Sequence, residues 1–189
     1  MSDIWVRWGA LTKSLISTRI AIEREKSFWQ EAEHVDASRL KLKAPAHDSK
    51  LTVKLPEHVE ALDDEDTLLS ATFVLSYALA EAEALTHLGL DARYTAGVED
   101  WGTRLLLSAE RTWSDVPGGL TGAVEVGVVR DLIVHGQNTL DERSHARLVK
   151  VGCMSYKVGD RIHLDFARVA RYRTRLRDLL TRGGVGATR

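Results

Sequence analysis

Residues 121–136 read TGAVEVGVVRDLIVHG, and this stretch decides how the rest of the chain is interpreted. At helical spacing, Val124, Val128 and Leu132 share one face with the histidine near its end, which predicts a helix through His135 packed against a core. Its last seven residues place an arginine, an aspartate and a histidine around three aliphatic side chains. Because charged groups are costly to bury, the end of this helix is a candidate for chemistry.

The end of this helix combines three groups that suit phosphate chemistry. Asp131 and His135 are four residues apart and share a helical face, whereas Arg130 lies about 140° round the helix from His135. A neighbouring carboxylate favours the protonated imidazole and fixes its orientation, and a helix C-terminus acts in the same direction. The Arg130 guanidinium matches the oxygens of a phosphate. The set suits transesterification of RNA, in which a 2′-hydroxyl attacks the adjacent phosphorus.

Spacing alone leaves a structural alternative open. Arg130 could pair with an acid such as Glu125, and His135 could cap the helix. An arginine and a histidine five residues apart often occur together by chance.

The composition describes an ordinary soluble chain. It has 189 residues, 44% apolar and 28% charged, which suits one domain with a real core. The formal net charge is −1, so an anion site must be local. The single cysteine, Cys153, excludes an internal disulfide and indicates a reducing compartment. The longest apolar run, 68–80, is short for a bilayer and the N-terminus lacks a secretion signal, so we expect a cytoplasmic protein that does not enter a membrane.

The apolar periodicity predicts a mainly α fold, a helical bundle with one or two short β-hairpins. Helices are expected over residues 3–34, from the acidic stretch 57–66 to a stop at Gly89, 98–113, 121–135 and 165–181. Alternating residues in 39–56 predict one hairpin, and SYKVGDRIHLD resembles a second about Gly159 and Asp160. The polar stretch after His135 is expected to be turns. We expect one domain over residues 1–182 and a disordered tail over 183–189.

Two surfaces each allow two interpretations. The long first helix either overhangs its own core and seeks a partner or packs along the bundle. The lysines of the 39–56 hairpin either contact a phosphate backbone or, the interpretation that we favour, keep an exposed strand edge from aggregating.

The last predicted helix carries the one strongly basic patch of the sequence. Val169, Tyr172, Leu176, Leu179 and Leu180 fall on one side, and arginines at 168, 171, 175 and 182 on another. Arg168, Arg171 and Arg175 are therefore candidate RNA-binding residues, although a solvated helix face is the interpretation that the pattern alone favours.

Several familiar motifs are absent from the sequence. It has no phosphate-binding loop of the Walker type, no GxSxG elbow, and no HExxH or Cys/His spacing for a metal, and its GGVG has no helix after it. We therefore expect an activity that needs neither a metal nor a cofactor.

RDLIVHG resembles the signature of the HEPN superfamily (higher eukaryotes and prokaryotes nucleotide-binding), an arginine followed after four residues by a histidine, with a polar residue directly after the arginine. Its setting is similar too, because VEVGVVRDLIVHGQNTLDE and YKVGDRIHLDFARVARYRTRLRDLL resemble the C-terminal half of stand-alone prokaryotic HEPN proteins. The resemblance covers roughly residues 98–182.

The resemblance implies a helical bundle that pairs through its motif helices, so that two motifs form one composite site. Active members are metal-independent endoribonucleases of toxin–antitoxin and antiviral defence systems. Arg130 would bind the scissile phosphate, His135 would act as general base or acid, and Asp131 would orient the histidine. The expected products are a 2′,3′-cyclic phosphate and a 5′-hydroxyl. The expected partners are RNA, a second copy of the chain, and an antitoxin or other defence protein.

Two positions differ from the family pattern. Some antitoxins modify a tyrosine two residues after the histidine, and that position here is Gln137. Asp131 stands where asparagine is commoner and adds negative charge near a phosphate. Two further interpretations therefore stay open: a non-catalytic HEPN module that binds RNA, nucleotide or protein, and a purely structural helical interaction protein.

Overall fold

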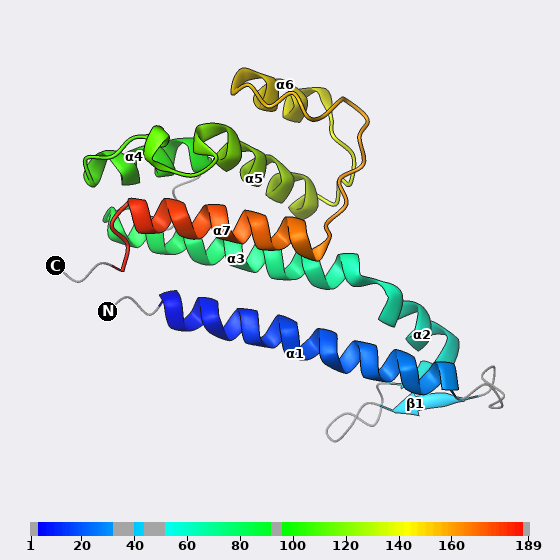
Figure 1. The fold of residues 1–189 in the computed structure, drawn as a ribbon. Coiled ribbons are helices and arrows are strands. Elements are labelled where there is room, and N and C mark those ends of the chain that lie inside the picture. The colour runs from blue at the N-terminus through cyan, green and yellow to red at the C-terminus, as the bar shows by residue number, and fades with distance from the viewer. Residues whose placement is uncertain (1–3, 32–39, 44–51, 92–95, 187–189) are drawn as a thin grey trace. The chain divides into compact units, whose positions relative to one another are not determined.

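The computed structural model describes residues 4–31, 40–43, 52–91 and 96–186. Over these residues the fold is mainly helical, with one antiparallel two-stranded hairpin, which confirms the predicted fold class at this level (Figure 1). The elements are α1 (Ile4–Glu31), β1 (Lys41–Lys43), β2 (Thr52–Lys54), α2 (Leu55–Asp63), α3 (Glu65–His87), α4 (Val98–Ser108), the 3₁₀ turn η1 (Trp113–Asp115), α5 (Gly119–Val134), α6 (Glu142–Lys150) and α7 (Phe166–Arg182).

The chain divides into two compact units. The smaller is Thr12–Leu68, and the larger combines Met1–Leu11 with Leu69–Arg189. The resemblance region and all the candidate site residues belong to the larger unit.

The smaller unit contains the predicted hairpin. Lys41 pairs with Lys54 and Leu42 with Val53, while the expected turn, in residues 44–51, lies outside the described residues. Helix α2 begins directly after β2 with a proline in its first turn, where a missing amide hydrogen has no cost. An ion pair of 3.0 Å joins Lys26 Nζ to Asp63 Oδ1 inside this unit.

The predicted helix from the acidic stretch to Gly89 is two helices, because Asp64 interrupts it. Asp64 leaves helical geometry, and its carboxylate accepts from the backbone N–H of Thr67 at 3.1 Å and from the Thr67 hydroxyl at 2.6 Å. An aspartate here therefore caps a new helix rather than continuing the old one. The predicted stop is confirmed, since Gly89 has φ +65° just after α3.

Helix α5 is the centre of the larger unit. It contacts α4, α6, α7 and η1, and α6 lies on the far side of α5 from α7 in Figure 1. Nine of its residues are buried, including Val124, Val128 and Leu132 of the predicted core face. Gly127 lies against Val98 of α4, and a Cβ at position 127 would be 2.9 Å from the Val98 Cγ1 atom. The absence of a side chain at this position therefore lets the two helices approach closely.

The polar stretch after α5 contains a helix that was not predicted. Asp141 caps α6 by accepting from the Ser144 N–H at 2.7 Å. The second predicted hairpin is wrong in its pairing: residues near Gly159 turn as expected, but Arg161 forms an isolated bridge with Thr139 instead of with its own neighbours. The segment directly after α5 takes the place of the strand that was expected before Gly159.

Helix α7 buries the predicted face, and its five predicted apolar residues are each at most 2% exposed. Phe73 of α3 packs against Tyr172, with ring centroids 5.3 Å apart. Residues 183–186, which we expected to begin a disordered tail, form a turn in which Val185 is 3% exposed, and 187–189 lie outside the described residues.

Helix α3 has the length and composition of a membrane span. Its most apolar 18-residue window has a mean hydropathy of 1.4, and 44% of that window is buried inside the protein. The sequence suggested a shorter apolar run, over residues 68–80. The cytoplasmic location that we expected from it stays a prediction.

Candidate functional site

Helix α5 ends at the predicted motif. His135 is the C-terminal cap residue, and the following Gly136 has φ +66°, the left-handed geometry that ends helices. The Gln137 N–H returns to the Leu132 carbonyl at 2.8 Å and closes the end. The His135 side chain is exposed, so its ring is accessible to solvent and to a partner. His135 therefore caps the helix with its backbone, as the structural alternative expected, while its imidazole stays available for proton transfer.

Arg130 is held from two sides one turn earlier in α5. Its Nη1 donates to Asp131 Oδ1 at 2.9 Å, and its guanidinium carbon lies 5.2 Å from the centre of the Tyr77 ring of α3. Its Nε is buried with no hydrogen-bond partner among the described residues. Arg130 pairs with its neighbour Asp131 rather than with Glu125, which was the alternative from the sequence.

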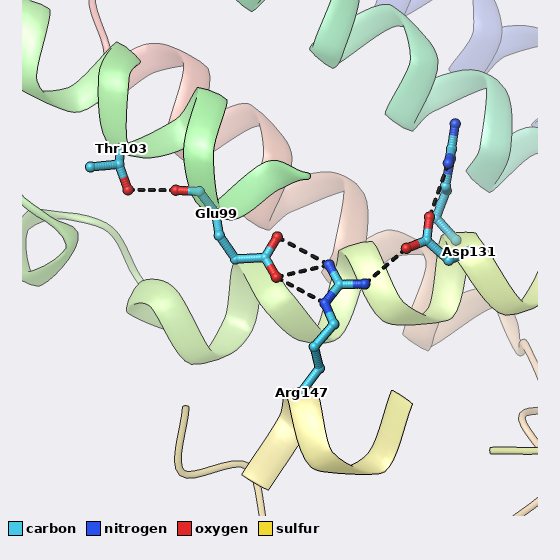
Figure 2. A network of polar contacts seen from close by, with 5 residues as sticks. Glu99, Thr103, Asp131 and Arg147 are labelled. Carbon is cyan, nitrogen blue, oxygen red and sulfur yellow. Dashed lines mark hydrogen bonds and ion pairs between the residues drawn. The ribbon is translucent and has the colours of Figure 1, made fainter. Parts of the chain in front are cut away.

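The Asp131 carboxylate lies between two arginines (Figure 2). Its second oxygen, Oδ2, accepts from Arg147 Nη1 of α6 at 2.9 Å. Arg147 also donates two hydrogen bonds to the Glu99 carboxylate of α4, from Nε at 2.9 Å and from Nη2 at 3.0 Å. Each Asp131 oxygen is thus bonded to an arginine, and the expected role of Asp131 in orienting His135 stays a prediction.

The network of Glu99, Arg147 and Asp131 ties three helices together. Burial opposes the charge on Arg147, but the hydrogen bonds to Asp131 and Glu99 outweigh it and raise the pKa of the guanidinium. Sequence reasoning missed Glu99 and Arg147, since 48 residues separate them and neither belongs to a short motif. Acids are common in the first turn of a helix, where they complement its dipole, so Glu99 at the start of α4 gives no separate signal.

A cavity of about 600 Å³ adjoins this network. It is lined by Tyr77, Glu81, Ala96, Gly97, Glu99, Asp100, Arg130, Asp131, Arg143 and Arg147. Burial raises the pKa of Glu81, and the positive charge of Arg130 opposes that shift. The cavity therefore joins one arginine of the predicted motif to acids and arginines that the sequence did not bring together.

The three arginines predicted to bind RNA have different surroundings on α7. Arg171 is exposed and lies over the Tyr172 ring, at 5.7 Å from its centre. Arg168 donates to the His163 carbonyl at 2.7 Å. Arg175 is paired with the buried Glu125. Arg171 is exposed, whereas Arg168 and Arg175 are half-buried.

Glu125 is the acceptor of a buried network. Its Oε1 accepts from the hydroxyls of Tyr156 at 2.6 Å and Tyr172 at 2.8 Å, while Oε2 accepts from Arg175 Nη1. Burial alone would raise the pKa of Glu125, but these hydrogen bonds and the Arg175 charge lower it on balance. A buried carboxylate that accepts three hydrogen bonds is a structural link between α5 and α7.

Metal ligands are not gathered in the described part of the chain. No three or more histidine, cysteine, aspartate or glutamate side chains are grouped there to hold a metal ion.

A scan against protein-family models, a search of curated proteins and a search of solved structures each return no match to this chain.

Proposed function

We propose that this protein is a metal-independent endoribonuclease of the HEPN type, acting as a homodimer in a toxin or defence system. The observation that carries the proposal is the end of α5: an exposed histidine follows, by one turn, an arginine that lines a cavity. The arginine is oriented by Tyr77 and Asp131 before any ligand arrives. A preorganised cation costs little reorganisation when negative charge develops on a phosphate.

The chemistry requires a base and an acid on opposite sides of the phosphorus. The base takes the proton of the 2′-hydroxyl as its oxygen bonds to phosphorus. The bond from phosphorus to the 5′-oxygen breaks, and the acid protonates that leaving oxygen. The products are a 2′,3′-cyclic phosphate and a 5′-hydroxyl, and no water is consumed.

One motif supplies one imidazole, which cannot stand on both sides of the phosphorus at once. Two copies would supply two His135 rings and two Arg130 guanidinium groups. The exposure of His135 leaves it accessible to a second copy. This argument supports the homodimer, in which one ring acts as base and the other as acid.

A specific observation favours a second candidate, a non-catalytic module. Four carboxylates and three arginines line the cavity, and Asp131 neutralises part of the Arg130 charge. Such a lining suits a ligand that carries both hydrogen-bond donors and negative charge more than a bare phosphate chain.

The test is incubation of purified protein with end-labelled RNA in excess EDTA. We expect fragments with 2′,3′-cyclic phosphate and 5′-hydroxyl ends, identified by their resistance to phosphatase and their ready labelling by a 5′-kinase. A protein that binds RNA without cutting it would instead support the non-catalytic module.

A further inference from the structure

The cavity beside Arg130 contains one acid that the surrounding arginines leave unbonded. Both Asp131 oxygens and both Glu99 oxygens accept from arginines, and Asp100 accepts from Arg104 at 2.9 Å. Glu81 lies in the cavity wall and is not bonded to an arginine, although the Trp101 side chain and the charge of Arg130 both act on its carboxylate. Its carboxylate therefore keeps acceptor positions that no arginine occupies.

The side of the cavity formed by α6 carries a free positive group. Arg143 lines the cavity, is exposed, and makes no hydrogen bond or ion pair with any described residue. It comes from α6, whereas Glu81 comes from α3, and these two helices lie on opposite sides of the network in Figure 2. A ligand that satisfies both groups has N–H donors at one end and negative charge at the other.

A nucleotide has this polarity, and its base must fit the Glu81 end. An ionised carboxylate only accepts hydrogen bonds, and it can accept two from adjacent donors. Guanine presents N1–H and N2–H side by side on one edge. Adenine and cytosine place an acceptor beside their donor, and uracil has a single N–H between two acceptors. Guanine is thus the base whose edge matches Glu81.

The size of the cavity and the position of Arg130 agree with this choice. A volume of about 600 Å³ lies within the usual range for small-ligand pockets. Tyr77 and Arg130 stand beside Glu81, so a base held there would place its sugar-phosphate near the motif arginine. We propose that this cavity is a guanine pocket, in which Glu81 reads the base edge and Arg143 meets the phosphate.

The inference deepens the proposed function and rests on it for the origin of the base, which is a guanosine of an RNA chain. A free guanine nucleotide would use the same chemistry. Binding by the mononucleotide can be measured without any cleavage, so the pocket and the ribonuclease activity are tested separately.

The first experiment is calorimetric titration of the protein with GMP, IMP and AMP in EDTA. IMP lacks the N2 amine and can donate only one hydrogen bond to Glu81. We expect GMP to bind about 10-fold or more tightly than IMP or AMP, since a good bidentate contact discriminates by roughly 1–3 kcal/mol. Equal affinity for the three nucleotides would overturn the guanine pocket, and this comparison needs no variant.

The second experiment compares Glu81→Gln with Glu83→Gln. Glu83 lies on the same helix and does not line the cavity, which makes it a matched control. The amide of glutamine offers one acceptor, so Glu81→Gln should lose the preference for GMP over IMP while Glu83→Gln retains it. Circular dichroism confirms that both variants are folded. A folded Glu81→Gln protein that still prefers GMP would contradict the assignment.

The source of the base is identified with oligonucleotides. A uridine 8-mer with one central guanosine should compete with GMP much better than an all-uridine 8-mer. If GMP binds but the oligonucleotide does not compete, the pocket takes a free nucleotide. RNA cleavage with no guanine preference in binding or cutting would overturn the pocket and leave the ribonuclease standing, while guanine preference without cleavage would overturn the ribonuclease alone.

Discussion

At the scale of single residues, the motif combines one exposed side chain with one that is held in place. His135 points from the cap of α5 into solvent, whereas Arg130 is bonded to Asp131 and stacked on Tyr77. Removing the first should therefore affect chemistry and leave the fold unchanged. Removing the second should also disturb the wall of the cavity.

We expect His135→Ala to lower RNA cleavage by about 100-fold or more with an unchanged melting temperature, because a proton-transfer group is lost from an exposed position. Arg130→Ala should cause similar damage, and Arg130→Lys should restore little, since a lysine lacks the planar fork. The double variant should be scarcely worse than either single one. The measurement is initial cleavage rate, with the exposed His87→Ala as control. Wild-type rates in His135→Ala would remove the histidine from the mechanism.

Glu125 is expected to matter for stability. Glu125→Ala leaves Arg175 and two tyrosine hydroxyls without their acceptor, which should lower the free energy of unfolding by about 3–5 kcal/mol. Urea unfolding measures this, and the exposed Glu60→Ala should change it little. A loss no larger than that of the control would contradict the network.

The lowered pKa of Glu125 also gives stability a pH dependence. The folded-state pKa lies below the ordinary value of 4.5, so the contribution of the ionised group is present above pH 4.5 and is lost as pH falls through the folded-state pKa. Wild-type protein should therefore lose stability on acidification below about pH 4.5, and Glu125→Gln should lose less over the same range. Parallel losses in the two proteins, measured by urea unfolding at each pH, would assign the acid sensitivity to other carboxylates.

At the scale of elements, the strongest apolar patterns predicted their helices well. The buried face of α7 and the core face of α5 follow directly from their spacing. Helix α6 was missed because it is short and polar, with Leu148 as its one buried residue, so its apolar signal is weak. The break before α3 was missed because Asp64 lies inside the acidic stretch 57–66, which we took as the start of one helix, although its side chain caps a new helix.

Part of the candidate site could be predicted from the sequence, and part of it could not. Arg130, Asp131 and His135 lie within one short motif, so a sequence pattern finds them. Arg147 and Glu99 meet Asp131 through tertiary contacts of three helices, which no local periodicity encodes.

The arginines of α7 should separate into structural and binding roles. Arg171→Glu should weaken RNA binding and reduce the slope of its salt dependence by about 1, because an exposed positive charge is lost. Arg177→Glu makes the same charge change about 240° round the helix and should have less effect. The assay is filter binding at several salt concentrations. Identical salt slopes for the Arg171→Glu protein and wild type would show that this face is solvated and does not contact RNA.

Arg175→Glu has a different expected result. It places a carboxylate against buried Glu125, so it should destabilise the fold by about 3 kcal/mol or more. Urea unfolding separates this loss of stability from a loss of RNA affinity. A stable Arg175→Glu protein with weakened RNA binding would instead show that Arg175 contacts RNA.

At the scale of the whole molecule, the proposed chemistry requires two copies. Light scattering at tens of micromolar should therefore give about twice the chain mass of 21.0 kDa. A monomer under these conditions would remove the composite site.

Subunit mixing tests whether the two copies share one site. Excess His135→Ala protein should suppress wild-type cleavage, because each mixed dimer lacks one of its two imidazoles. Excess His87→Ala should leave the cleavage rate per wild-type chain unreduced. If excess His135→Ala has no effect after subunit exchange, each chain cuts alone.

Gly97 has φ −70° and ψ 175°, a backbone that any residue can adopt, yet a Cβ there would lie 2.6 Å from Glu99 Oε2 and 3.3 Å from Arg147 Nη2. The glycine thus makes room for a salt bridge rather than for a turn. In evolutionary terms, the three positions should change as a group. A descendant that gains alanine at 97 is expected to shift the Glu99 carboxylate and weaken its bond to Arg147, which relaxes the selection that keeps the pair and the cavity wall it forms.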